Sequence, residues 1–333
     1  MRRVIGLFER LVTSDHLDAS ARDFVRGKRR RADVAAFLFR REEVLSRLGM
    51  ALAEGSWRPA GFTPIRVHDP KPRVIARAPV EDRIVQAAIG ALLEPILLRT
   101  ATDDNFACRT GYGTQRALLR LQEGMDRHPK ALHLDVRAYF ASINIDILRG
   151  LLGARIADAR FLGLLDRILE AGVGLYDSPE DRAFLGLDEA WPPRGRGLPV
   201  GALTSQLLAT HLYLEGLDHF VKRVLHVPAY VRYVDDLFLF GDGLGELRGW
   251  GEAVGEWLWC ARDLKLKRPE APVLSCGGHL DALGVRLRRG GQEPLPGALR
   301  RLGGVCWTAA RAGRVSTPRD DARLVGMIGH LVG

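Results

Sequence analysis

The chain contains 333 residues and carries 49 Lys and Arg against 40 Asp and Glu, a formal net charge of +9. Its hydrophobic content of 47% is typical of a globular protein with a substantial core, and no window approaches the run of ~18 apolar residues that a membrane span needs. Four scattered cysteines exclude a short-spaced zinc site and a disulfide scaffold, and the early charges exclude a secretory leader, so we expect a cytoplasmic protein.

The excess of positive charge favours a polyanionic partner, above all nucleic acid, because neutralising phosphates releases counterions. However, 43 of the 49 basic residues are arginine, a bias that a GC-rich genome also produces. The charge alone therefore leaves both explanations open.

The first third of the chain is predicted to be mainly helical. Apolar residues recur at helical spacing over 20–52, beside a basic cluster at 26–31. Prolines punctuate 57–80 and indicate short strands or loops there. A helix is expected over 82–98, and a second one over 114–125 after a glycine-containing loop.

In the middle of the chain, an apolar strand over 132–136 includes Asp135 near its end. The pattern predicts a helix over 145–170 and then a loop-rich insertion over about 172–197, which we expect at the surface. A tight Gly/Pro loop at 197–201 opens a further apolar helix.

Two short apolar segments within Tyr230–Phe240 flank the adjacent carboxylates Asp235 and Asp236. Alternating β-branched and aromatic residues on both sides predict a β-hairpin with an acidic turn. Asp is also a common turn residue for local reasons, so a plain turn is the alternative. A helix over 246–264, strands within 280–287 and a basic helical tail from Leu295 are expected to follow.

The strand end at Asp135 and the acidic hairpin together predict a cluster of three carboxylates at one sheet edge. Nucleotidyl transfer uses such a site to hold two Mg²⁺ ions about 3.5–4 Å apart. Mg²⁺ prefers oxygen ligands and keeps waters or substrate phosphates in its shell, so a few carboxylates suffice.

The sequence resembles the reverse transcriptases over nearly its whole length. The palm signature of this family corresponds to Tyr233-Val234-Asp235-Asp236, and the upstream signature to Asp135-Val136-Arg137-Ala138-Tyr139-Phe140. The resemblance implies an α+β right-hand polymerase fold with fingers (1–125), an RRM-like antiparallel palm (126–290) and a short helical thumb (291–333).

The resemblance also implies the site. Asp135, Asp235, Asp236 and the backbone carbonyl of Val136 would hold two Mg²⁺ ions, with Mn²⁺ as a possible substitute. Residues implied to contact the nucleotide or the template are Lys71, Arg73, Arg83, Phe140, Val200, Gly201, Gln206 and Tyr233. Phe140 corresponds to an aromatic gate against the ribose 2′-hydroxyl, with core packing as its alternative. Arg83 follows two acidic residues, so a solvated ion pair is its alternative.

The subtype depends on Val200, Gly201 and Gln206 in the loop and helix that begin at Gly197. Val in place of the Gln common in retroviral and group II intron enzymes resembles the error-prone reverse transcriptases of diversity-generating retroelements. The implied partners are a template RNA, an RNA/DNA hybrid, dNTPs and a small basic helical accessory protein. A host-defence or group II-like reverse transcriptase and an inactive RNA-binding scaffold are the alternatives.

Overall fold

The computed structural model describes residues 3–68, 71–297 and 299–300. Within them the chain forms two compact units, each assembled from separate stretches of sequence. The first unit contains residues up to Ala101, Val136–Gly216 and Trp257–Lys265; the second contains Thr102–Asp135, Leu217–Glu256 and the part from Leu266 onward. The predicted fingers, palm and thumb boundaries stay a prediction, and most of the predicted thumb lies outside the described residues.

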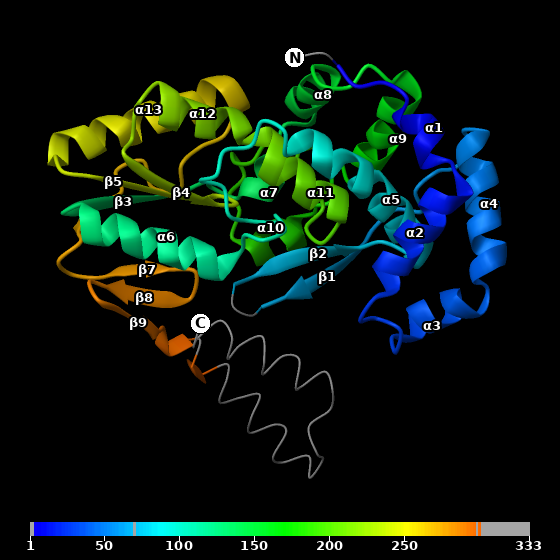
Figure 1. Ribbon diagram of the computed structural model, residues 1–333, viewed down its shortest axis with the longest axis horizontal. Coiled ribbons are helices and arrows are strands. Elements are labelled where there is room, and N and C mark those ends of the chain that lie inside the picture. The colour runs from blue at the N-terminus through cyan, green and yellow to red at the C-terminus, as the bar shows by residue number, and fades with distance from the viewer. Residues whose placement is uncertain (1–2, 69–70, 298, 301–333) are drawn as a thin grey trace, which may run out of the picture. The chain divides into compact units, whose positions relative to one another are not determined.

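The first unit begins with a series of helices that lie to one side of a longer, largely buried helix (Figure 1). They are α1 (Leu7–Leu11), α2 (Ser14–Val25), α3 (Ala32–Phe39), α4 (Arg41–Ala53) and α5 (Val80–Leu97). The helix predicted over 82–98 is confirmed as α5. The helical pattern predicted over 20–52 is confirmed in α2, α3 and α4; α2 ends before Gly27, whose φ of 71° is left-handed, and Arg40 separates α3 from α4.

The rest of the first unit contains a two-stranded antiparallel ribbon and short helices. These elements are β1 (Thr63–Val67), β2 (Arg73–Arg77), α7 (Tyr139–Ser142), α8 (Ile145–Gly153), α9 (Ala159–Glu170), α10 (Pro179–Leu185), α11 (Leu203–Leu208) and the π-helical turn η1 (Ala209–Tyr213). The helical pattern predicted over 145–170 is confirmed in α8 and α9. The Asp158 side chain accepts a hydrogen bond from the backbone N–H of Phe161 and begins α9.

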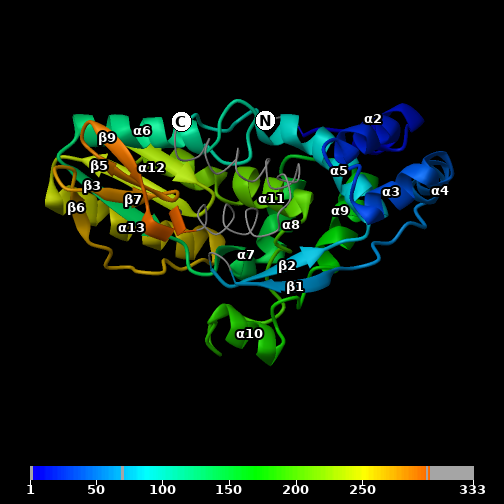
Figure 2. The same ribbon diagram turned by 90° about the horizontal axis from the view of Figure 1, so that it is seen from below.

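The predicted insertion over 172–197 is not a simple surface loop. It contains α10, which packs against β2 (Figure 2). Tyr176, Asp181, Arg182 and Trp191 within it are buried. The Arg182 guanidinium donates hydrogen bonds to the carbonyls of Asp188 and Pro192. These internal hydrogen bonds allow part of the segment to be buried, although its loop-like composition predicted a solvent-exposed segment.

The second unit is built on a four-stranded antiparallel sheet with the order β4-β5-β3-β6. Its strands are β3 (Lys130–Asp135), β4 (Ala229–Tyr233), β5 (Asp236–Gly241) and β6 (Val273–Ser275). The predicted strand over 132–136 and the predicted hairpin are thereby confirmed. A second antiparallel sheet comprises β7 (Leu280–Ala282), β8 (Val285–Arg288) and β9 (Gly291–Pro294).

Helices lie on both faces of the four-stranded sheet (Figure 1). On one face is α6 (Thr114–Arg127), which confirms the helix predicted over 114–125; on the other are α12 (Glu215–Arg223) and α13 (Leu244–Arg262). α6 packs so closely that a Cβ at Gly124 would lie 2.6 Å from the Phe240 ring. A Cβ at Gly251 of α13 would lie 3.0 Å from Leu132 on the opposite face. The mixed helix and sheet composition confirms the predicted α+β class.

Within the part of the chain that the structure describes, no helix is long and apolar enough to cross a membrane.

Candidate active site at the acidic hairpin

Two of the predicted carboxylates face each other across neighbouring strands. Asp135 is the last residue of β3 and Asp236 is the first residue of β5, and the two are Cα partners in the antiparallel register. Directly opposed residues in an antiparallel pair project from the same face of the sheet. The sequence separates these side chains by about a hundred positions, and the β3–β5 pairing brings them to one sheet edge.

The third carboxylate, Asp235, lies in the turn of the hairpin. Tyr233 and Asp236 form the last register pair of β4 and β5, so Val234 and Asp235 make a two-residue turn. Val234 has a φ of 59°, a left-handed conformation that is rare for a β-branched residue. A positive φ at the first central position is the feature that lets a two-residue turn follow the twist of its strands.

Two basic side chains contact the opposed carboxylates. The Nε2 atom of His133 lies 2.8 Å from Oδ1 of Asp236, and because an ionised carboxylate only accepts, Nε2 is the donor. The His133 ring also stacks on Phe238, with centroids 4.3 Å apart. On the other carboxylate, Lys267 Nζ donates to Oδ2 of Asp135 at 3.0 Å.

Neither of these basic residues was predicted from the sequence. His133 carries a usable signal, since a residue two positions before Asp135 in a strand faces the same side of the sheet. Lys267 carries none, because it is 132 positions from Asp135 and reaches it only through the fold. Both contacts hold the carboxylates in place at the sheet edge.

Tyr233 is fixed by the helix on the same face of the sheet. Its hydroxyl lies 3.0 Å from the hydroxyl of Thr114, the first residue of α6. This contact joins the start of α6 to the end of β4. The predicted nucleotide-contacting role of Tyr233 stays a prediction.

The donor set fits Mg²⁺ through the two opposed carboxylates. Among the described residues, no group of three or more His, Cys, Asp and Glu side chains is arranged to hold a metal ion. Mg²⁺ is usually bound by one or two protein carboxylates together with waters and substrate phosphates, so Asp135 and Asp236 would be the residues to hold it. The predicted participation of Asp235 and of the Val136 carbonyl stays a prediction.

In the first unit, the fold brings the loop at 197–201 onto β2. The backbone N–H of Ala76 donates to the carbonyl of Val200 at 2.7 Å. Gly201 has a φ of 102°, and a Cβ there would lie 3.0 Å from Ile75, so this close approach requires glycine. Arg73, at the start of β2, is exposed on the same ribbon.

Val200 itself packs against an apolar cluster. The cluster contains Val74, Ala141 and Tyr176. The backbone N–H of Val200 donates to the Tyr176 hydroxyl at 3.1 Å, and that hydroxyl donates to the carbonyl of Leu198 at 2.8 Å. Burial raises the pKa of Tyr176 well above its ordinary value, so the phenol stays protonated and keeps both contacts.

The remaining predicted residues of the first unit occupy varied environments. Phe140 is partly buried and its carbonyl accepts from the backbone N–H of Leu198 at 2.8 Å, which joins α7 to the same loop. Val136 is buried, whereas Lys71 and Gln206 are exposed. Their predicted contacts with nucleotide or template stay predictions.

Arg83 forms an ion pair with Asp33, and its predicted contact with the nucleotide or template stays a prediction. Its guanidinium donates to Asp33 at 2.6 Å and lies 5.3 Å from the centre of the Phe24 ring. Only 17% of its side chain is exposed. An ion pair within the helical part of the first unit accounts for this arginine without a bound triphosphate.

Comparisons with known proteins identify the fold. No protein-family model and no curated protein matches the sequence. The structure is similar to telomerase from Candida albicans, solved with a fragment of telomeric RNA, at a TM-score of 0.51 and 12% identity over 77% of this chain and 49% of that one. Apo telomerase from Candida tropicalis gives a TM-score of 0.51 at 10% identity over 76% of this chain and 53% of that one.

A foamy viral protease-reverse transcriptase solved with double-stranded DNA aligns more weakly, with a TM-score of 0.38 at 13% identity over 84% of this chain and 38% of that one. The chain has a reverse transcriptase fold. It spans about half the length of the telomerase structures it matches. Within this fold, β4 and β5 form the acidic hairpin.

Proposed function

We propose that the protein is an RNA-directed DNA polymerase. The observation that carries this proposal is the register pairing of Asp135 with Asp236 beside the acidic turn, on the antiparallel sheet of a reverse transcriptase fold. The formal charge of +9 suits a nucleic acid partner. Template RNA, an RNA/DNA hybrid and dNTPs are the proposed ligands, and the solved telomerase that carries telomeric RNA is in keeping with them.

In this proposal Asp135 and Asp236 hold Mg²⁺ with the help of Asp235 and the Val136 carbonyl. Two such ions would supply activation of a primer 3′-hydroxyl and charge stabilisation of the leaving pyrophosphate, with Mn²⁺ as a possible substitute. His133 orients the Asp236 carboxylate by its hydrogen bond of 2.8 Å. Lys267 balances the charge of Asp135, and its half-exposed ammonium is a donor that phosphate oxygens could also bind.

Substitution of the turn carboxylate tests the activity. Asp235→Ala should reduce extension of oligo(dT) on poly(rA) by at least about a thousandfold, because metal-assisted charge stabilisation is worth several kcal/mol. Asp242→Ala is the matched control, since Asp242 follows the other end of β5 and its side chain is largely exposed. Undiminished extension by the Asp235 variant would overturn the proposed carboxylate site.

We further propose that copying is error-prone, as in a diversity-generating retroelement. The support is Val200, which packs into an apolar cluster and whose backbone N–H and carbonyl are both hydrogen-bonded. An apolar side chain at this position makes only apolar contact, whereas a Gln amide donates and accepts hydrogen bonds and helps to check the shape of a base pair.

The substitution Val200→Gln tests this second proposal. It should lower the frequency of errors opposite template adenine in primer-extension sequencing by up to about tenfold, the discrimination that one positioned hydrogen bond supplies. Val200→Leu is the control, because it keeps an apolar side chain and should keep the wild-type error spectrum. An unchanged spectrum with Gln would refute the role of Val200 in fidelity.

Two alternatives give different outcomes in these assays. An inactive RNA-binding scaffold would bind RNA but would not extend primers with either Mg²⁺ or Mn²⁺. A host-defence or group II-like reverse transcriptase would extend primers, yet its gene would lack a paired template repeat and variable repeat nearby. A small basic helical accessory protein remains the proposed protein partner for a retroelement role.

A further inference from the structure

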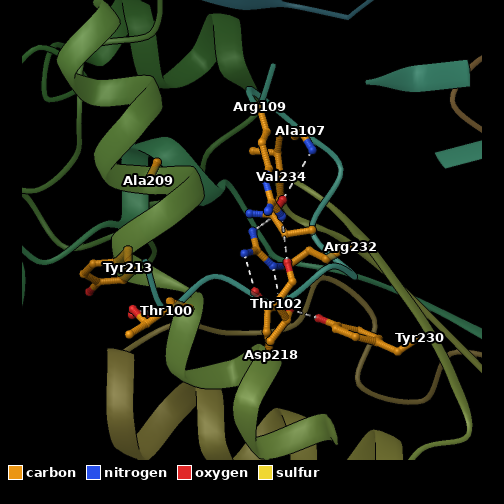
Figure 3. A network of polar contacts seen from close by, with 12 residues as sticks. Thr100, Thr102, Ala107, Arg109, Ala209, Tyr213, Asp218, Tyr230, Arg232 and Val234 are labelled. Atoms are coloured by element: carbon orange, nitrogen blue, oxygen red, sulfur yellow. Dashed lines mark hydrogen bonds and ion pairs between the residues drawn. The ribbon is translucent and has the colours of Figure 1, made fainter. Parts of the chain in front are cut away.

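A fully buried ion pair lies beneath the acidic turn in the second unit. The Arg232 Nε and Nη2 atoms donate to the two oxygens of Asp218 at 2.7 and 2.6 Å, and the side chains are 0% and 2% exposed. The hydroxyl of Tyr230 donates to the same carboxylate at 2.9 Å (Figure 3). Arg232 of β4 is therefore held in one orientation by a carboxylate from α12, with Tyr230 of its own strand as the second donor.

The pair has a further contact that leads directly to the turn. The remaining terminal nitrogen of Arg232, Nη1, donates to the backbone carbonyl of Val234 at 3.1 Å (Figure 3). Val234 is the residue with the left-handed φ of 59°. Such a conformation in a β-branched residue persists only where the surrounding structure enforces it, and this hydrogen bond is an enforcing contact.

The backbone of Arg232 is anchored as well. Its N–H donates to the carbonyl of Asp104 at 2.8 Å, and its carbonyl accepts from the N–H of Phe106 at 3.0 Å. These bonds pair the outer edge of β4 with the segment 104–106. Both the backbone and the side chain of Arg232 thus have fixed positions from which Nη1 reaches the turn.

Stability alone does not account for the pair. Replacing a buried ion pair by apolar side chains of similar size is often neutral or stabilising, because burial removes the hydration of both charges. An apolar pair, however, offers no donor to the Val234 carbonyl. The buried pair therefore provides a hydrogen bond to the turn that an apolar pair would lack.

We propose that Arg232 is a positioning residue, held by Asp218, that keeps Val234 in the left-handed conformation and so presents Asp235 and Asp236 at the sheet edge. This inference rests on the proposed polymerase function. A displacement of about 1 Å of a reacting group lowers a rate by about a hundredfold, so a small relaxation of the turn is enough to matter.

The test replaces both partners together. The double variant Arg232→Met/Asp218→Leu should fold, with a cooperative thermal transition, and should extend oligo(dT) on poly(rA) about ten- to a hundredfold more slowly than the wild type. The matched control is Arg155→Met/Glu215→Leu, which removes a largely buried Arg–Glu pair of the first unit. It should keep the wild-type rate.

A second background separates positioning from general structural damage. Glycine adopts a positive φ without strain, so Val234→Gly should make the turn less dependent on Arg232. The double variant should slow oligo(dT) extension by a factor that is at least about fivefold smaller in the Val234→Gly background than in the wild-type background. An equal loss in both backgrounds would overturn the inference.

A structural readout keeps this inference distinct from the proposed function. In a crystal structure of Arg232→Met/Asp218→Leu, Val234 should leave the left-handed region; an unchanged positive φ would refute the role of Arg232 whatever the activity. Absence of extension by the wild-type protein would instead refute the polymerase proposal. The φ of Val234 in the variant would then still decide the question of positioning.

Discussion

Two arginine–aspartate pairs, one in each unit, show how access to water changes the role of the same chemistry. In the first unit, Arg83 and Asp33 are 2.6 Å apart with side chains 17% and 22% exposed. In the second, Arg232 and Asp218 are 2.6 Å apart with both side chains fully buried. Hydration compensates for a lost partner in the first case but not in the second, so only the buried pair fixes its neighbours rigidly.

The surroundings of the two pairs also differ in their access to water. Asp33 is shared with a second arginine, Arg77, at 2.8 Å, so its carboxylate belongs to a partly hydrated charge cluster. Asp218 is shared with the phenol of Tyr230. Burial, reinforced by the nearby Asp218 charge, raises the pKa of Tyr230 well above its ordinary value, which keeps the phenol protonated as a donor.

The largest effect is expected from breaking the buried pair on one side. Asp218→Ala leaves the Arg232 guanidinium buried without its carboxylate and should lower the free energy of unfolding by about 3–5 kcal/mol. Urea titration followed by circular dichroism measures this loss. Tyr230→Phe is the control, because it removes one neutral donor and should lower the free energy by only about 1 kcal/mol. Equal losses for the two variants would show that the ion pair is not the rigid element.

The sequence predicted the strands and several helices because their signals are local. The alternating pattern on both sides of Asp235 and Asp236 predicted the hairpin, and the apolar run before Asp135 predicted β3. The boundary between α8 and α9 was missed, although Asp158 is a good N-cap residue and carried a local signal for it.

The contacts that complete the candidate site are not local, and the sequence did not predict them. Arg232 and Asp218 are 14 positions apart on a strand and a helix, and only tertiary packing shows that they meet. A charged residue within an apolar strand nevertheless indicates a buried ion pair. The same limit applies to Arg83, whose ion pair with Asp33 joins residues 50 positions apart and has no local signal.

The smallest effect concerns the partly exposed pair of Arg83 and Asp33, and it is visible mainly in the pH dependence of stability. Burial would raise the pKa of Asp33, but hydrogen bonds from Arg83 and Arg77 outweigh it and lower the pKa to about 2. An Asp in the unfolded chain has a pKa of about 3.9, so the unfolded state takes up its proton first as the pH falls. The stabilisation by Asp33 is therefore complete above about pH 4 and is lost as the pH falls toward 2.

The variant Asp33→Asn isolates this contribution from the other carboxylates. At pH 6 it should lower the free energy of unfolding by about 1 kcal/mol, a value reduced by hydration and salt because the pair is partly exposed. At pH 3 the difference in the free energy of unfolding between wild type and variant should be smaller than at pH 6. Addition of 0.5 M salt at pH 6 should reduce this difference as well. A difference that is the same at both pH values would mean that Asp33 acts through its shape and hydrogen bonds alone, and the contrast with the buried pair would then lie in packing and not in charge.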